Sequence, residues 1–175
     1  MKIAINGGHF DRLDSGAVGA SGLHEANVTY EIMGKVAGFL QQAGYDTLQI
    51  CENELYQITD AANNWGADLF VSIHCNAAAN TDAQGTETFC YTLGAAGEKL
   101  ARCVQSQIID SMGTVDRGIK TANFAVIRDT NMPAVLVETA FISNLDDEKL
   151  LASEQRRSDF AAAIARGVTD YCAAA

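Results

Sequence analysis

Residues 68–73, DLFVSI, form a nearly continuous apolar run, and this run constrains the fold more than any other feature of the sequence. A strand that faces water on one side alternates apolar and polar residues, whereas a strand covered on both faces does not. The run therefore predicts a central strand of a largely parallel sheet, with helices packed on both faces of that sheet.

Strand-like and helix-like segments alternate along the rest of the chain. Apolar residues recur at helical intervals in Glu25–Gln42, and Leu55–Trp65 is also expected to be helical. Gly44 and Gly66 stand where glycines commonly end a helix. The other strands are predicted at residues 2–6, 45–51, 86–91, 124–127 and 134–138, and the other helices at residues 95–112 and along the apolar stripe of Phe160, Ile164, Val168 and Tyr171.

This alternation predicts one three-layer α/β domain over residues 1–175, with a twisted, mostly parallel sheet and helices on both faces. A length of 175 residues suits one domain, and the single proline, Pro133, leaves no proline-rich linker. With 48% hydrophobic and 19% charged residues, the composition is that of a globular protein and excludes a largely disordered chain.

Charge and hydropathy exclude several classes of partner. A net charge of −10 argues against sequence-independent nucleic-acid binding, which needs a basic surface. No apolar stretch approaches the roughly 20 residues of a membrane span. The apolar run in MKIAINGGHF ends at Asn6, too early for a signal peptide. We therefore expect a protein made in the cytoplasm without Sec-type export, and we expect it to be a monomer.

The five cysteines are odd in number and none belongs to a CxxC pair, which argues against a zinc ribbon or a thioredoxin-like centre. We expect free thiols that act mainly as small apolar side chains. Cys75 is the one candidate for other chemistry, because it follows a histidine and a cysteine nucleophile needs a nearby base.

Polar residues gather where predicted strands end. His9 follows the first strand, and His74 follows the run of residues 68–73. Glu138 ends the strand AVLVE, and Glu25 begins the first helix. Ligands of parallel sheets bind beyond the carboxyl ends of the strands, so these side chains can meet at one edge. Two histidines and one carboxylate are the ligand set of a catalytic zinc site, and a further glutamate can act as its general base.

Each of these residues also has a purely structural explanation. A glutamate at a helix start, such as Glu25, complements the helix dipole. Glu138 could pair with Arg117 or Arg128, and a histidine after a strand is commonly an ordinary loop residue. The combination of all four residues, and no single one of them, indicates a metal-dependent site.

Five separated segments, in order, resemble the zinc-dependent N-acetylmuramoyl-L-alanine amidases of the Amidase_3 family. They extend from Lys2 to Asn144, and the final helix also fits the end of the family. The resemblance is specific because several motifs occur in the right order with polar residues in the right places. The segments are IAINGGHFDRLDSGAVG, HEANVTYEI, ADLFVSIHCNAAAN, GTETFCYT and DRGIKTANFAVIRDTNMPAVLVETAFISN.

The resemblance implies one zinc ion held by His9, Glu25 and His74, with Glu138 as the catalytic glutamate. It also implies the reaction, which is hydrolysis of the amide between the lactyl group of N-acetylmuramic acid and the L-alanine of the stem peptide. The substrate would be peptidoglycan. His24 is expected outside the ligand set, because neighbouring helical positions point about 100° apart.

The first segment departs from the family pattern, which reads DPGHGG. This chain has Asn6 for the aspartate, Gly7 for the proline, and Phe10 and Asp11 for the two glycines. The departure leaves open what holds the His9 ring, although Asn6 could accept a hydrogen bond near the metal ligands.

Substrate contacts are predicted from residue chemistry alone. Arg117 and Arg128 could each clamp a stem-peptide carboxylate, and Asn76 and Glu87 could supply polar groups near the cleft. The alternative for each is a structural or surface ion pair.

Two other functions remain open at this point. The first is a zinc peptidase that cuts within the stem peptide, and the second is a wall-binding module without catalysis. Without a leader, the chain would reach the cell wall after lysis or by another non-Sec route, as an endolysin or as an autolysin of sporulating cells.

Overall fold

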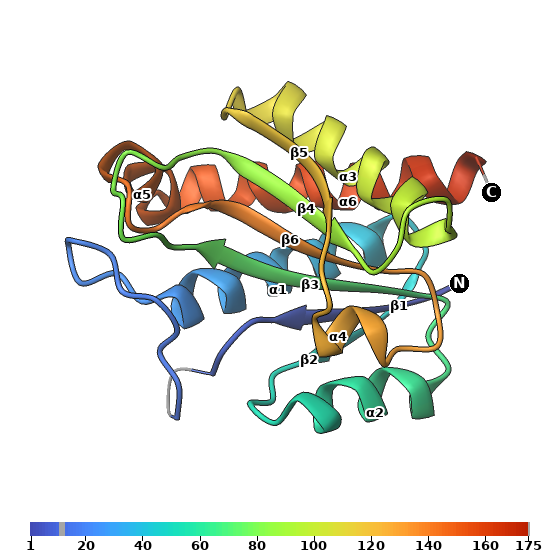
Figure 1. Cartoon of the computed structure of the whole chain (residues 1–175). Coiled ribbons are helices and arrows are strands. Elements are labelled where there is room, and N and C mark those ends of the chain that lie inside the picture. Colours follow the sequence, from blue (N-terminus) through green and yellow to red (C-terminus); the bar gives the residue numbers. More distant parts are fainter. Residues whose placement is uncertain (11–12, 175) are drawn as a thin grey trace.

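The apolar run lies in β3 (Leu69–Asn76), a central strand of the computed structural model, which describes residues 1–10 and 13–174. The strand is flanked by β1 (Lys2–Gly7) and β6 (Ala134–Phe141), both parallel to it. Within the described residues, the sheet has six strands in the order β2-β1-β3-β6-β4-β5 (Figure 1). The central position of β3 explains why its sequence lacks the alternation of a half-exposed strand.

The other strands and helices largely alternate along the chain. Strands β2 and β1 are parallel, β4 is antiparallel to β6, and β5 is parallel to β4. The predicted mostly parallel α/β fold is therefore confirmed. The remaining elements are β2 (Asp46–Ile50), β4 (Thr86–Cys90), β5 (Asp116–Thr121), α1 (Glu25–Gln42), α2 (Leu55–Trp65), α3 (Ala96–Met112), α4 (Ala125–Arg128), α5 (Leu145–Ala152) and α6 (Glu154–Ala174).

Two apolar cores cover the two faces of the sheet. Leu69, Val71 and Ile73 of β3 pack into the larger core with α1, α3 and α6. Phe70, between them in sequence, packs into the smaller core with α2 and α4 (Figure 1). Because successive side chains of a strand point to opposite faces, His74 emerges on the side of α2 and α4.

Both helices predicted to end at a glycine do so. Gly44 and Gly66 have φ values of +88° and +70°, in the left-handed region that favours glycine. The helices α1 and α2 match their predicted bounds, and α3 begins one residue later than predicted.

The prediction of a strand at residues 124–127 is wrong, because this segment forms the helix α4. The places beside β6 are taken by β3 and β4, so the segment instead buries Val126 and Ile127 in the core that α2 shares. Two elements were not predicted, β5 and α5. Strand β5 reads DRGIKT and is a half-exposed edge strand, so it carries no apolar pattern.

No helix of the described residues has both the length and the apolar character needed to cross a membrane. All five cysteines are free, and two of them contact the sulfur atom of a methionine.

Gly167 lies where α6 packs closely against α3. A methyl group at this position would lie 2.4 Å from the Cα of Val104. We expect Gly167→Ala to lower the free energy of unfolding by about 1–3 kcal/mol, because two packed helices would have to separate. Urea denaturation monitored by circular dichroism measures this change.

The matched control is Gly38→Ala in α1, where an added methyl group meets no described atom within 4 Å. This control should be neutral or more stable by up to about 1 kcal/mol, because alanine favours the helix. Equal losses in both variants would contradict the packing explanation.

Candidate metal centre and catalytic cleft

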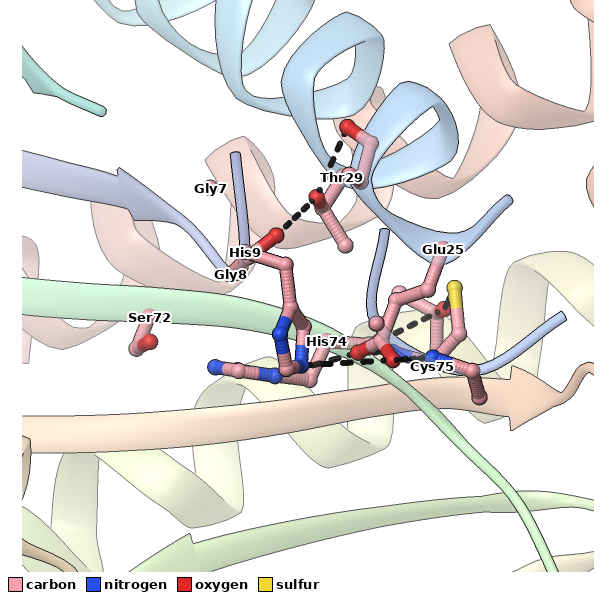
Figure 2. Close-up of polar contacts among 12 residues, drawn as sticks. Gly7, Gly8, His9, Glu25, Thr29, Ser72, His74 and Cys75 are labelled. Carbon is pink, nitrogen blue, oxygen red and sulfur yellow. Dashed lines mark hydrogen bonds and ion pairs between the residues drawn. The ribbon is translucent and has the colours of Figure 1, made fainter. Parts of the chain in front are cut away.

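Three side chains from three different elements meet at the carboxyl end of the sheet. His9 follows β1, Glu25 is the first residue of α1, and His74 lies on β3. Their ligand atoms all lie within 4.8 Å of one another, a spacing that would fit one metal ion. Figure 2 shows these side chains converging on a common point.

The Glu25 carboxylate lies between the two histidine rings. Its Oε2 atom is 3.4 Å from Nε2 of His9, and its Oε1 atom is 3.1 Å from Nδ1 of His74. The backbone N–H groups of Cys75 and Ala17 donate to Oε1 and Oε2, both at 3.0 Å. Glu25 is only 3% exposed, and burial alone would raise its pKa. Hydrogen bonding and charge from His74, with the two backbone bonds, outweigh burial and lower the pKa, so the carboxylate stays ionised.

Asp14 holds the His9 ring, a contact that the sequence did not reveal. Its Oδ2 atom is 2.6 Å from Nδ1 of His9, and its Oδ1 atom accepts a hydrogen bond from the Gly16 backbone. The bond from His9 and then the bond from Gly16 lower the pKa of Asp14. A proton on Nδ1 leaves the Nε2 lone pair facing Glu25, which is the tautomer that a metal ligand needs.

Asn6 has a different role from the one considered above. Its side chain donates to the carbonyls of Gly7 and Ile50 and accepts a bond from Ser72 at 2.7 Å, so it joins β1, β2 and β3. Asp14, rather than Asn6, is the outer partner of His9. Asp11, another departure from the family pattern, lies outside the described residues.

The backbone around His9 is tightly specified. His9 itself has a φ of +62°, a strained value for a residue with a side chain. The carbonyl of Gly8 accepts a 2.6 Å hydrogen bond from the Thr29 hydroxyl, visible in Figure 2. The Gly8 backbone N–H also donates to the carbonyl of Ile73 on β3. These bonds fix the turn that directs His9 toward Glu25.

Glu138 lines the same cleft as His9 and His74. Glu138 lies on β6, where its register partners are His74 of β3 and Glu87 of β4, so the three residues form a row across the sheet. Its Oε2 atom is buried and makes no hydrogen bond with the described residues. Burial, then the charges of Glu25 and Glu87, raise the pKa of Glu138 to about 8. The alternative that Glu138 pairs with an arginine is therefore not what the structure shows.

The predicted substrate residues fall into two groups. Asn76 donates to Oε1 of Glu87 at 2.8 Å, and Arg117 donates to its Oε2 at 2.7 Å. Lys120, which the sequence did not single out, pairs with the same carboxylate. Burial would raise the pKa of Glu87, but the two cations lower it overall. Arg128 lies apart from this group, lines the cleft and pairs with Asp129.

Two further residues from the sequence analysis lie outside the metal group. His24 precedes α1 and is absent from the described cluster of His9, Glu25 and His74. The Cys75 side chain is 4% exposed, and burial raises its pKa well above the usual range. A buried neutral thiol does not suit a nucleophile. Cys75 instead contributes its backbone N–H to Glu25.

Comparison with known proteins identifies a family that matches this chain. The Amidase_3 family, described as N-acetylmuramoyl-L-alanine amidase, matches residues 3–170. The chain belongs to the Amidase_3 family.

Its relatives include amidases of known structure. The solved structure of the N-acetylmuramoyl-L-alanine amidase AmiC2 of Nostoc punctiforme superposes with a TM-score of 0.93 at 34% identity, covering 99% of this chain and 97% of that one. The amidase LytC of Bacillus subtilis is 38% identical over 97% of this chain. The sporulation-specific amidase of the same organism is 37% identical over 95% of this chain. This Amidase_3 chain spans 35% of LytC and 65% of the sporulation-specific protein.

Gly8 leaves the space that the His74 ring occupies. A methyl group at position 8 would lie 2.2 Å from the ring, so the flexible ring would have to move. We expect Gly8→Ala to keep the fold but to weaken zinc binding at least about tenfold, since one ligand is displaced. Competition with a chromophoric chelator measures the affinity.

The control for this substitution is Gly34→Ala in α1, where the nearest described atom would be 3.7 Å from the added methyl group. Unaltered zinc affinity in Gly8→Ala would contradict the placement of the His74 ring.

The raised pKa of Glu138 predicts a pH dependence in metal-free protein. Between its ordinary pKa of 4.5 and its folded value of about 8, the folded state holds a proton that the unfolded state has lost. Stability contributed by this group therefore falls as pH rises through that window. Glu138→Gln removes this titrating group. The free energy of unfolding of the variant, relative to that of the unsubstituted protein, should therefore increase from pH 5 to pH 8. Parallel urea-denaturation profiles for the two proteins would contradict this assignment.

Proposed function

We propose that residues 1–175 form the catalytic unit of a zinc-dependent amidase that cleaves peptidoglycan between N-acetylmuramic acid and L-alanine. One observation carries the proposal. The cluster of His9, Glu25 and His74 shares a cleft with Glu138, a buried carboxylate with an unpaired oxygen. Family membership and the names of the relatives support the same reaction.

The donor set suits zinc. Two imidazole nitrogens and a carboxylate oxygen are typical zinc ligands, and three protein ligands leave a position for water or substrate. When bound, the ion would supply Lewis-acid chemistry, which lowers the pKa of water and polarises the scissile carbonyl. Glu25 would offset part of the positive charge, and its two backbone hydrogen bonds keep it ionised and in place.

Glu138 provides the proton transfer that amide hydrolysis requires. As water adds to the amide carbonyl, Glu138 accepts a proton from the water, and it then gives that proton to the leaving nitrogen of L-alanine. The C–N bond breaks, and the products are a lactyl carboxylate and a free amine. A pKa raised by burial and by two neighbouring carboxylates suits a group that holds a proton between these two events.

Arg128 is proposed to bind a carboxylate of the stem peptide, because it lines the cleft and carries an exposed guanidinium. Asn76 and Arg117 satisfy Glu87 instead, and these three are not among the described residues that line the cleft. We propose that this group sets the charge beside Glu138.

The proposed working place is the cell wall, where the substrate lies. The protein is proposed to act as a monomer. Its charge of −10 gives no electrostatic attraction to an anionic polymer, so recognition would depend on the cleft. The name of the sporulation-specific relative supports a role in sporulating cells, and release by lysis is the alternative route.

Digestion of purified peptidoglycan tests the proposed reaction. We expect peptides with a free L-alanine amine and uncut glycan chains, both seen by mass spectrometry, and no products in the presence of a chelator. Cuts inside the stem peptide would identify a peptidase instead, and zinc-independent binding without products would identify a binding module.

Substitution of Glu138 tests its role separately. We expect Glu138→Gln to retain zinc while the rate of amide cleavage falls by about 10²–10⁴-fold, because a positioned acid–base group contributes about that much. Zinc content measured by atomic emission serves as the control. Full activity in this variant would exclude Glu138 as the base.

A further inference from the structure

The cleft extends well beyond the metal group. It has a volume of about 610 Å³ and passes between the start of α2 and the helix α4. His9, His74 and Glu138 lie in one part of its lining, and Asn53 lies in the stretch just before α2. A substrate that extends from the metal group along the cleft toward α2 would therefore also contact Asn53.

Asn53 is an anomaly among the buried polar groups. Both its Oδ1 and its Nδ2 atoms are buried, and neither makes a hydrogen bond with any residue that the structure describes. Its side chain also does not cap α2, whose preceding residue is Glu54. An unpaired buried donor and an unpaired buried acceptor each destabilise a folded protein. Fold stability therefore gives no reason for an amide at this position.

An unpaired side-chain amide can form two complementary hydrogen bonds with one kind of chemical group. A secondary amide presents one N–H and one C=O, and a primary amide can pair with both through its own oxygen and nitrogen. We propose that Asn53 is a substrate-recognition residue that pairs with a secondary amide of peptidoglycan in the cleft. This inference rests on the proposed function and adds to it a specific recognition contact.

The walls beside Asn53 strengthen such a contact. Ile58 and Val126 are 4% and 5% exposed, and Leu136 lines the same cleft. Phe124 contributes an aromatic ring that is 40% exposed. Apolar walls exclude water from a bound ligand, so hydrogen bonds there discriminate strongly against a partner that cannot form them.

Peptidoglycan offers a secondary amide from two sources. One is the backbone of the stem peptide beyond L-alanine, and the other is the N-acetyl group of the muramic acid. Three soluble muramoyl-peptides separate these sources. The first is unmodified, the second is N-methylated at the bond after L-alanine, and the third lacks the N-acetyl group.

The experiment compares Asn53→Leu with the unsubstituted protein. Leucine has a similar size but cannot form hydrogen bonds, so we expect the KM for the unmodified substrate to rise by about tenfold. We expect the melting temperature to stay equal or to rise, because an unpaired buried amide has been removed. A merely structural asparagine would lower the melting temperature and leave KM unchanged. Asn64→Leu, an exposed position of α2 outside the cleft, is the matched control.

The modified substrates identify the source of the amide. If Asn53 pairs with the peptide amide, the two proteins should have similar KM values for the N-methylated substrate. If Asn53 pairs with the N-acetyl group, they should have similar KM values for the substrate that lacks this group. An unchanged KM in Asn53→Leu, or an equal loss on all three substrates, overturns the inference.

Binding measured without turnover separates this inference from the proposed function. In Glu138→Gln protein, calorimetry gives Kd for the unmodified substrate with and without Asn53→Leu. An unsubstituted protein that binds but never cleaves would refute the proposed reaction, whereas a Kd that is independent of Asn53 would refute only the recognition contact.

Discussion

The Glu25 carboxylate is the interaction on which the geometry of the cleft depends. It contacts both histidine rings, and it accepts hydrogen bonds from the backbone of Ala17 and of Cys75. It thus joins the loop after β1, the start of α1 and the end of β3 at one point. Because the carboxylate is buried, its charge needs all of these partners. The same contacts bring His9 and His74 together at the proposed metal site.

The cleft combines groups that a stable fold alone would not favour. Among the residues that the structure describes, Glu138 is a buried carboxylate without a hydrogen-bond partner for one oxygen, and Asn53 is an amide without such a partner for either polar atom. His9 adopts a left-handed backbone conformation. Such unfavourable features concentrate where a protein binds or transforms a ligand, and the rest of the sheet compensates for them. The two apolar cores supply this compensation on either side of β3.

Sequence patterns identified most elements because their apolar residues follow the period of the element. The stripes in α1 and α3 and the run in β3 are examples. The two stripes lie in the larger core, and the run in β3 is divided between the two cores. The pattern failed at residues 124–127 and at β5. Residues 124–127 form a helix, and the places beside β6 are taken by β3 and β4. Strand β5 lies at the edge of the sheet, where a strand needs little apolar surface.

The sequence by itself determined the α/β class, the family, and the residues that could bind a metal, because strand-end polar residues stand out against apolar runs. Only the tertiary structure showed that Asp14 orients His9, that Lys120 joins Glu87, and that the Asn53 amide has no hydrogen-bond partner in the described part of the chain. These facts concern which donors and acceptors meet across distant segments. Pairing of this kind depends on the packing of the whole chain, and no local period in the sequence encodes it.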